Sequence, residues 1–156
     1  METVSKVKIT IIRHAESEFN AGIPGADKKP NCPLSEHGKK QASQIKGEFD
    51  LVICSPLQRA QETFLHSQIQ TRDFFLSHLC REIHDGNIIN LLAEEIGKKD
   101  VEQKEEIQQR IDHLRELIQL LSKKYQRICL ISHFCFLSAI TKLPWINNAE
   151  MFEFEL

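Results

Sequence analysis

The sequence predicts an α/β fold: a three-layer sandwich whose largely parallel central sheet carries helices on both faces. Apolar, β-branched runs at residues 8–12, 51–54 and 127–132 are typical of strands buried on both faces. Helical stretches separate these runs, and a strand–helix–strand order implies right-handed crossovers between parallel strands. The 156 residues suit a single domain, which we expect to span residues 1–156.

The first part of the chain is expected to form a strand, a loop and a helix. The strand at residues 8–12 stops at the polar pair Arg13 and His14. Residues 20–33 contain two glycines and three prolines, which predicts a loop without regular structure beside a strand end. Ser35 is suited to cap a helix that continues to about residue 48, although Gly38 weakens its first turn.

The middle of the chain is expected to repeat this order. After the strand at residues 51–54, Ser55 and Pro56 combine an N-cap residue with a proline at the first helical position. That helix should reach about His66. Residues 74–79 are a weaker strand candidate, and residues 81–90 are turn-like around Asp85 and Gly86.

A long amphipathic helix begins the last part of the chain. Apolar residues recur there at steps of three and four, which predicts one buried stripe on a helix over residues 101–124. A buried strand at 127–132 and a helix at about 134–141 follow. The alternation over residues 151–156 predicts an edge strand.

Composition and charge exclude several classes of protein. The formal net charge is −2 and basic residues are interleaved with acidic ones, so we expect no nucleic-acid partner. No apolar run approaches the roughly 20 residues of a spanning helix, and no export signal is visible, so we expect no membrane association. Five cysteines without CxxC spacing favour a reduced, cytoplasmic protein.

Polar clusters follow three of the predicted strands. Arg13 and His14 end the first, residues 55–59 follow the second, and Ser132 and His133 end the last. Sheets of this type bind ligands at the carboxyl ends of their strands. Arginines and histidines meeting there would form a cationic pocket for a phosphate-sized dianion, and a neutral imidazole can attack phosphorus. Taken alone, Arg13 and His14 are also compatible with a simple strand end at the surface.

Four motifs in sequence order resemble the histidine phosphatase superfamily, which has the phosphoglycerate mutase-like fold. Residues 13–20, RHAESEFN, resemble its Arg-His-Gly signature with an asparagine six positions after the histidine. Residues 33–42, PLSEHGKKQA, resemble its Pro-Leu-Thr-x-x-Gly-x-x-Gln-Ala helix opening. Residues 54–63, CSPLQRAQET, are similar to its Ser-x-x-x-Arg-Ala-x-x-Thr block, and residues 130–133, LISH, to its Val-Ser-His block. Together they span the chain from about residue 7 to 140 and are highly specific.

The resemblance implies a small phosphatase that hydrolyses a phosphomonoester without a metal ion or cofactor. His14 would be the nucleophile that becomes phosphohistidine, which agrees with the need of phosphoryl transfer for positioning and charge neutralisation. The side chains expected to hold the phosphoryl group are Arg13, Asn20, Arg59, His133 and, lining the pocket, Ser17.

The family also places an acidic residue after its third strand, where it protonates the leaving oxygen. Glu82 best fits this position and would then take a proton from the water that hydrolyses the phosphohistidine. Asp85 is the reserve candidate. The alternative for Glu82 is a solvated surface acid beside Arg81.

Two residues depart from the family pattern. Ala15 replaces the glycine after the nucleophile, and Phe134 replaces the glycine after the second histidine. Either side chain would narrow or reshape substrate access, unless Phe134 turns into the core. Neither change removes a reacting group, so we expect activity to survive and the substrate to be affected.

Other chemistries fit the sequence less well. Cys54 and Arg59 are separated by four residues rather than the five that a cysteine-dependent phosphatase needs, so Cys54 is interpreted as a buried strand end. Cys135 is expected to line the core. The histidines outside the motifs are expected to be ordinary surface or satisfied residues, and among them His84 has the best chance of reaching the pocket.

The kind of substrate stays open between a phosphorylated small molecule and a phosphoprotein. The short chain leaves little room for the insertions of mutases, which favours hydrolysis, because water must reach the phosphohistidine. A lid formed by residues 83–100 would favour a small metabolite, whereas an open rim would favour a phosphohistidine protein phosphatase. A non-catalytic phosphate-binding regulatory module of the same fold is the remaining alternative. The sequence does not indicate the oligomeric state.

Overall fold

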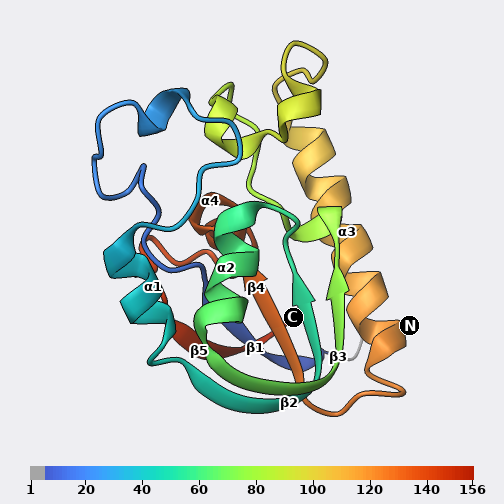
Figure 1. The fold of residues 1–156 in the computed structure, drawn as a ribbon. Coiled ribbons are helices and arrows are strands. Elements are labelled where there is room, and N and C mark those ends of the chain that lie inside the picture. Colours follow the sequence, from blue (N-terminus) through green and yellow to red (C-terminus); the bar gives the residue numbers. More distant parts are fainter. Residues whose placement is uncertain (1–5) are drawn as a thin grey trace.

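The computed structural model describes residues 6–156 and contains a five-stranded sheet with the strand order β3-β2-β4-β1-β5 (Figure 1). Four strands are mutually parallel, and β5 pairs antiparallel with β1 at one edge. The predicted, largely parallel α/β sheet and its C-terminal edge strand are therefore confirmed. The strands are β1 (Lys8–Arg13), β2 (Lys46–Cys54), β3 (Gln68–Leu76), β4 (Ile128–Ser132) and β5 (Met151–Glu155).

The helices cover both faces of the sheet, as predicted. Helices α1 (Glu36–Ala42) and α2 (Gln58–His66) lie on one face, and α3 (Lys104–Leu121) and α4 (Phe134–Thr141) lie on the other (Figure 1). Neighbouring residues of one strand point to opposite faces, which is why nearly every core position of the central strands is apolar. Ile11 packs with the residues of α3 and α4, whereas Ile12 packs on the side of α2.

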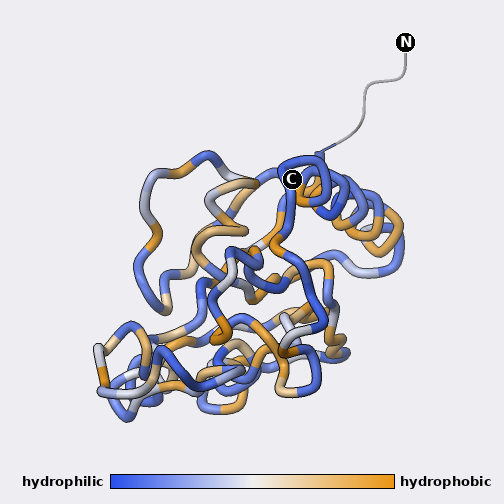
Figure 2. The backbone as a smooth tube through the Cα atoms, turned by 90° about the horizontal axis from the view of Figure 1, so that it is seen from above, coloured by the Kyte–Doolittle hydropathy of each residue, from blue (hydrophilic) through white to orange (hydrophobic). Residues whose placement is uncertain are grey.

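The long helix α3 is amphipathic. Ile111, Leu114 and Ile118 are buried against the sheet, while most of its charged residues face solvent. Figure 2 shows hydrophobic and hydrophilic residues alternating along the turns of this helix. The helix is three residues shorter at each end than the predicted range 101–124. Among the described residues, no helix is long and apolar enough to cross a membrane.

Two predicted boundaries in the first half of the chain are wrong. The helix expected to reach about residue 48 ends at Ala42, and β2 already begins at Lys46. The reason is a long-range pairing, because residues 46–49 lie in parallel register with residues 68–71 of β3. Strand β3 itself occupies residues 68–76 rather than 74–79 for the same reason.

The start of α2 also differs from the prediction. Its N-cap is Leu57, and the hydroxyl of Ser55 accepts a hydrogen bond from the backbone N–H of Leu57 in a turn before the helix. Ser55 and Pro56 therefore precede the N-cap rather than occupying the N-cap and first helical position. Four short 3-10 helices lie in the connecting segments: η1 (Ala26–Lys28), η2 (His78–Cys80), η3 (Ile88–Asn90) and η4 (Ala93–Glu95).

Ser35 caps α1 as predicted, and Gly38 has a structural reason to be glycine. The Ser35 hydroxyl accepts a hydrogen bond of 3.0 Å from the backbone N–H of Gly38. A Cβ atom at Gly38 would lie 1.9 Å from the carbonyl oxygen of Glu16, so no side chain fits there. This close approach packs α1 against the segment that follows β1.

Strand register brings the predicted polar clusters to one edge of the sheet. Arg13 is paired with Ser132, and Cys54 is paired with Ile131. The residues that follow these positions, among them His14, Ser55 and His133, therefore leave the sheet side by side.

Candidate active site

A cavity of about 240 Å³ lies at the carboxyl ends of the central strands. Its walls come from four segments: the residues after β1, the first turn of α2, the segment 82–90 and the start of α4. Its lining therefore combines side chains from distant parts of the chain. The lining residues are Arg13, His14, Ser17, Phe19, Asn20, Arg59, Glu82, Asp85, Asn87, Ile89, Asn90, Phe134 and Cys135.

One ring nitrogen of His14 is hydrogen-bonded, and the other has no hydrogen-bond partner within residues 6–156. Its Nδ1 lies 2.6 Å from the carbonyl oxygen of Ala15. A carbonyl can only accept, so Nδ1 carries the proton and Nε2 carries the lone pair. The backbone around it is held as well, because the N–H of Ala15 donates to Thr63 Oγ1 and the N–H of His14 donates to the carbonyl of Ser132.

The environment of His14 favours the neutral ring. Burial, and secondarily the positive charge of Arg59, lower the pKa of His14 well below its ordinary value near 6.5. At neutral pH the imidazole is therefore uncharged, and its Nε2 lone pair is available to a nearby electrophile.

Arg13 is buried at the end of β1, and its guanidinium group is fixed by residues that lie outside the sheet. Its Nη1 donates to the carbonyl of Ile146 at 2.6 Å. Its guanidinium carbon lies 5.1 Å from the ring centre of Phe134 and 5.6 Å from that of Trp145, within the range of cation–π attraction. Its Nε is buried without a hydrogen-bond partner in the described structure.

Arg59 provides a second buried guanidinium from the first turn of α2. Its Nη1 donates to the carbonyl of Ile89 at 2.9 Å, and its Nη2 donates to Asn90 Oδ1 at 2.5 Å. Burial lowers the pKa of Arg59 to about 10, so the group remains cationic at neutral pH. The segment around η3 therefore holds this charge at the cavity.

His133 lies beside His14 but is deeper in the protein, and it is fully buried. Its Nε2 is 2.8 Å from the hydroxyl of Ser55, whereas its Nδ1 has no partner among the described residues. The Ser55 hydroxyl already accepts from Leu57, and its own proton has no acceptor in the described structure other than His133 Nε2. That arrangement places the imidazole proton on Nδ1, as an unused donor next to His14.

Asn20 and Ser17 form a small hydrogen-bonded unit at the cavity. Asn20 Oδ1 accepts from the backbone N–H of Ser17, from the Ser17 hydroxyl at 2.9 Å and from Asn148 Nδ2. The amide nitrogen of Asn20 is left to donate into the cavity. The single hydroxyl proton of Ser17 is used on Asn20, so the contact of Ser17 with a ligand would be indirect.

Glu82 connects the cavity to helix α4. One carboxylate oxygen accepts from the backbone N–H groups of Ile83 and Phe136, and the other accepts from that of Cys135 at 3.0 Å. The carboxylate thus satisfies two of the unpaired N–H groups at the start of α4. Glu82 is 9% exposed rather than a solvated surface acid. Asp85 lies at the exposed rim and accepts from the backbone of Asn87.

Two expectations about other side chains are wrong. Cys135 does not line the core: it is exposed and lines the cavity, because Cys135 lies on the solvent side of the first turn of α4. His84 is neither exposed nor satisfied, since it is 7% exposed and its Nδ1 has no partner among the described residues. It lines a separate cavity of about 420 Å³ on the far side of Glu82. Cys54 is fully buried, as predicted.

The sequence did not reveal the residues whose hydrogen bonds orient the side chains of the site. Asn90 and the carbonyl of Ile146 orient the two arginines, and Asn148 contacts both Asn20 and the carbonyl of His14. These residues lie in irregular segments without a strong pattern. A signal was available only for Ser55 and Thr63, which belong to the recognised motif at residues 54–63.

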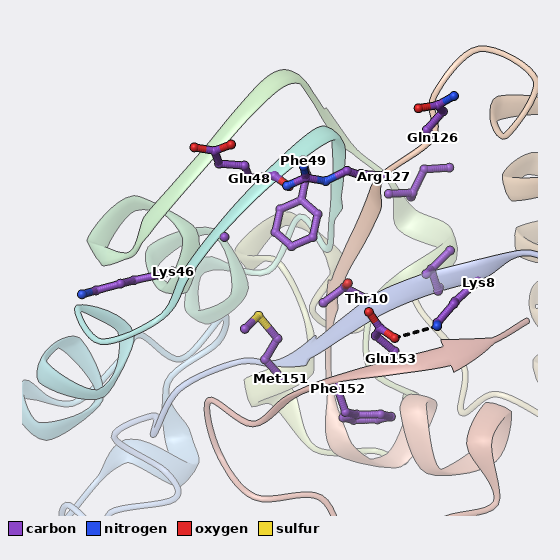
Figure 3. Close-up of a pocket in the computed structure, with 13 residues that line it drawn as sticks. Lys8, Thr10, Lys46, Glu48, Phe49, Gln126, Arg127, Met151, Phe152 and Glu153 are labelled. Carbon is purple, nitrogen blue, oxygen red and sulfur yellow. Dashed lines mark hydrogen bonds and ion pairs between the residues drawn. The ribbon is translucent and has the colours of Figure 1, made fainter.

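A larger cavity of about 530 Å³ lies at the opposite end of the sheet and lacks comparable chemistry (Figure 3). It is formed where β1, β2 and β4 begin and is open to solvent. Its charged groups include the exposed ion pair between Lys8 and Glu153 at 2.9 Å, and no histidine or cysteine lines it. Within residues 6–156, no group of three or more potential metal-ligating side chains is found anywhere.

The family model of the histidine phosphatase superfamily (branch 1) matches residues 9–155. The chain belongs to this superfamily. The resemblance inferred from the four motifs is thereby confirmed. The segments that line the cavity, from Arg13 to Cys135, all lie within the matched range.

Relatives within the histidine phosphatase superfamily are named as phosphatases. The chain is 33% identical over 104 residues to phosphoserine phosphatase 1 of Hydrogenobacter thermophilus, a match that covers 60% of this chain and 46% of that protein. It therefore spans less than half the length of that curated relative.

Solved structures of superfamily members share the fold at low sequence identity. The α-ribazole phosphatase of Shigella flexneri is 19% identical with a TM-score of 0.67, and the superposition covers 94% of this chain and 89% of that one. The phosphoserine phosphatase of Entamoeba histolytica, solved with 3-phosphoglyceric acid, is 22% identical with a TM-score of 0.65 and covers 95% and 90%. These likenesses establish the phosphoglycerate mutase-like fold.

Proposed function

We propose that this protein hydrolyses a phosphomonoester through a phosphohistidine formed on His14, with Glu82 as the proton donor and without a metal ion. One observation carries the proposal. The Nδ1–H of His14 is held by the carbonyl of Ala15, so Nε2 is a neutral nucleophile beside two buried guanidinium groups. A buried nucleophile next to Arg13 and Arg59 is suited to an anionic electrophile such as a phosphoryl group.

In the first step, the lone pair of His14 Nε2 forms a bond to phosphorus as the bond from phosphorus to the leaving oxygen breaks. Arg13, Arg59 and the amide of Asn20 neutralise the phosphoryl oxygens. The ring becomes positively charged, and the Ala15 carbonyl at Nδ1 stabilises that charge. In this step Glu82 acts in its protonated form: its proton passes to the leaving oxygen, which departs as an alcohol and leaves Glu82 as a carboxylate.

In the second step, water attacks the phosphohistidine and gives a proton to Glu82. The bond from phosphorus to Nε2 breaks, inorganic phosphate is released, and His14 returns to its neutral form. We further propose that His133, which is buried beside His14 and outside the cavity lining, donates its Nδ1–H to a phosphoryl oxygen when substrate is bound.

A small phosphorylated molecule is favoured over a phosphoprotein. Asp85, Asn87, Ile89 and Asn90 contribute one wall of the cavity, and Arg59 is bonded to two of these residues. Part of the segment 83–100 thus forms one wall of the cavity, and we take this as support for a small ester rather than an extended protein surface. The names of the relatives, a phosphoserine phosphatase among them, support the same class.

The test is an activity assay on a generic aryl phosphate with wild type, His14→Ala and the control His113→Ala, whose histidine is exposed on α3. We expect turnover by wild type and His113→Ala and none by His14→Ala. Added chelator should leave wild-type turnover unchanged. Equal turnover by wild type and His14→Ala would exclude His14 as the nucleophile.

A trapping experiment tests the intermediate. Brief incubation with labelled substrate should leave phosphate on wild type that is stable in alkali and labile in acid, as expected for phosphohistidine. The same label persisting on His14→Ala would overturn the assignment. A protein that never turns over any ester yet binds inorganic phosphate would instead be the non-catalytic phosphate-binding module.

A further inference from the structure

The cavity provides enough positive charge for one phosphoryl group and none beyond it. Among its lining residues, the permanently charged cations are Arg13 and Arg59. Its remaining charged lining groups, Glu82 and Asp85, are acidic. A phosphoryl dianion would match the two guanidinium groups, and a carboxylate elsewhere on the same substrate would find no further permanent cation among the lining residues and would lie near Asp85 at the rim. The leaving group of a well-bound ester is therefore uncharged.

Two phenylalanine side chains line part of the same cavity. Phe19 and Phe134 both belong to its lining, and Phe19 is 39% exposed, a large value for a phenylalanine. Trp145 lies 4.9 Å from Phe134, ring centre to ring centre, and is 63% exposed. Phe134 is half-buried: it packs against the edge of the main hydrophobic core, contacts Trp145 and also lines the cavity. The rings of Phe134 and Trp145 form a continuous apolar surface beside Arg13.

The size of the cavity limits what this surface can bind. Its volume of about 240 Å³ lies below the roughly 300 Å³ at which sites for drug-sized ligands begin. A phosphoryl group attached to a single ring is therefore better matched to it than a larger conjugate.

We infer that the substrate is a small phosphomonoester whose leaving group is uncharged and carries one aromatic ring, and that Phe134 is a specificity-determining residue that stacks on this ring. The inference rests on the proposed function and deepens it. Stacked or edge-to-face aromatic pairs add attraction beyond simple burial, and the ring of Phe134 is already oriented by Trp145 and Arg13. Together with burial, we expect about a tenfold preference.

Hydrolysis of matched esters tests the inference. Benzyl phosphate, cyclohexylmethyl phosphate and ethyl phosphate all release an unactivated primary alcohol, so intrinsic reactivity changes little among them. We expect kcat/KM for benzyl phosphate to exceed that for ethyl phosphate about tenfold and to exceed that for the cyclohexyl compound severalfold. 3-Phosphoglycerate should be the poorest substrate because of its carboxylate. Equal values for benzyl and ethyl phosphate, or a preference for 3-phosphoglycerate, would overturn the inference while leaving the phosphatase proposal intact.

Two variants assign the preference to a residue. Phe134→Leu keeps an apolar side chain at the start of α4 and should remove most of the benzyl preference. The control Phe75→Ala changes an exposed phenylalanine on the edge strand β3, outside the cavity lining, and should keep the wild-type ratio. A ratio that Phe134→Leu does not alter would exclude Phe134 as the specificity residue.

A binding measurement separates failure of the inference from failure of the proposed function. Benzylphosphonate and ethylphosphonate cannot be hydrolysed, and Trp145, the single tryptophan of the chain, reports on ligands near Phe134 by its fluorescence. We expect benzylphosphonate to bind wild type about tenfold more tightly. Equal affinities would overturn the inference even in a protein without turnover. Tighter benzylphosphonate binding without turnover would overturn the proposed function alone.

Discussion

The imidazole rings of His14 and His133 lie 5.0 Å apart, centre to centre, with their planes inclined by 55°. Both rings are buried, and both face the positive charge of Arg59. Burial first, and then that charge, lower the pKa of each histidine well below its ordinary value. Two neutral imidazoles therefore lie side by side where a nucleophile and a hydrogen-bond donor are needed.

This pair predicts that stability falls as the pH drops below about 6.5. In the unfolded chain both histidines take up protons near pH 6.5, whereas in the folded protein they remain neutral to much lower pH. The unfolded state therefore binds more protons in this window, and each histidine contributes a slope of up to about 1.4 kcal/mol per pH unit. Urea unfolding of wild type and His133→Ala between about pH 5 and pH 7 measures it. The variant should show the flatter profile, with His113→Ala as the control, and identical slopes would contradict the assignment.

Glu82→Gln should slow hydrolysis in a way that depends on the leaving group. The amide cannot supply the proton, so a poor leaving group such as ethanol should lose about 10²- to 10⁴-fold in kcat/KM, and 4-nitrophenol much less. Equal losses for both esters would count against Glu82 as the acid. Glu105→Gln, an exposed glutamate in the first turn of α3, serves as the control.

A structural effect of Glu82 is expected beside the catalytic one. Glu82→Ala removes the acceptor of three backbone N–H groups, two of them at the start of α4. Unsatisfied buried donors cost about 1–3 kcal/mol, so Glu82→Ala should be less stable than Glu82→Gln in urea unfolding. Equal stability of the two variants would mean that α4 does not depend on this carboxylate.

Arg59→Lys should impair catalysis although it keeps the charge. A lysine cannot donate to Ile89 and Asn90 and also present a planar, two-pronged donor to a phosphoryl group. We expect kcat/KM on an aryl phosphate to fall by about 10²-fold, the usual effect of removing one donor to a transition state. The matched control is Arg72→Lys, an exposed arginine on β3 that should retain wild-type kinetics. Comparable kinetics in both variants would show that the guanidinium shape is unimportant.

Gly38→Ala should destabilise the protein, because Gly38 is a buried position of α1. The added methyl group would collide with the backbone of Glu16. A backbone segment cannot move aside as the end of a flexible side chain could. Forcing atoms into a packed region typically costs about 1–3 kcal/mol, against the small gain expected for alanine in a helix. Thermal and urea unfolding should place this variant well below Lys40→Ala, an exposed change in the same helix. A variant as stable as wild type would refute the close packing of α1 on the segment after β1.

Much of the fold was predictable because its signals are local. Strands buried on both faces require consecutive apolar residues, so β1 and β4 are visible as short β-branched runs that end at polar residues. The helix at residues 134–141 agrees with the prediction residue for residue. Where pairing between distant residues decides, prediction failed: residues 46–48 were expected to continue the preceding helix but are extended because β3 pairs with them.

The sequence by itself placed three groups of the site at one edge of the sheet. Parallel strands place their carboxyl ends at one edge, so Arg13, His14 and His133 had to converge once those runs were recognised as neighbouring strands. Only the tertiary structure decided how the groups are held and what surrounds them. The Ala15 carbonyl at His14, the Asn90 contact of Arg59 and the position of Phe134 between Trp145 and the cavity depend on loops and helix ends. Contacts across such irregular segments leave no periodic pattern in the sequence, because they follow from the packing of the whole chain.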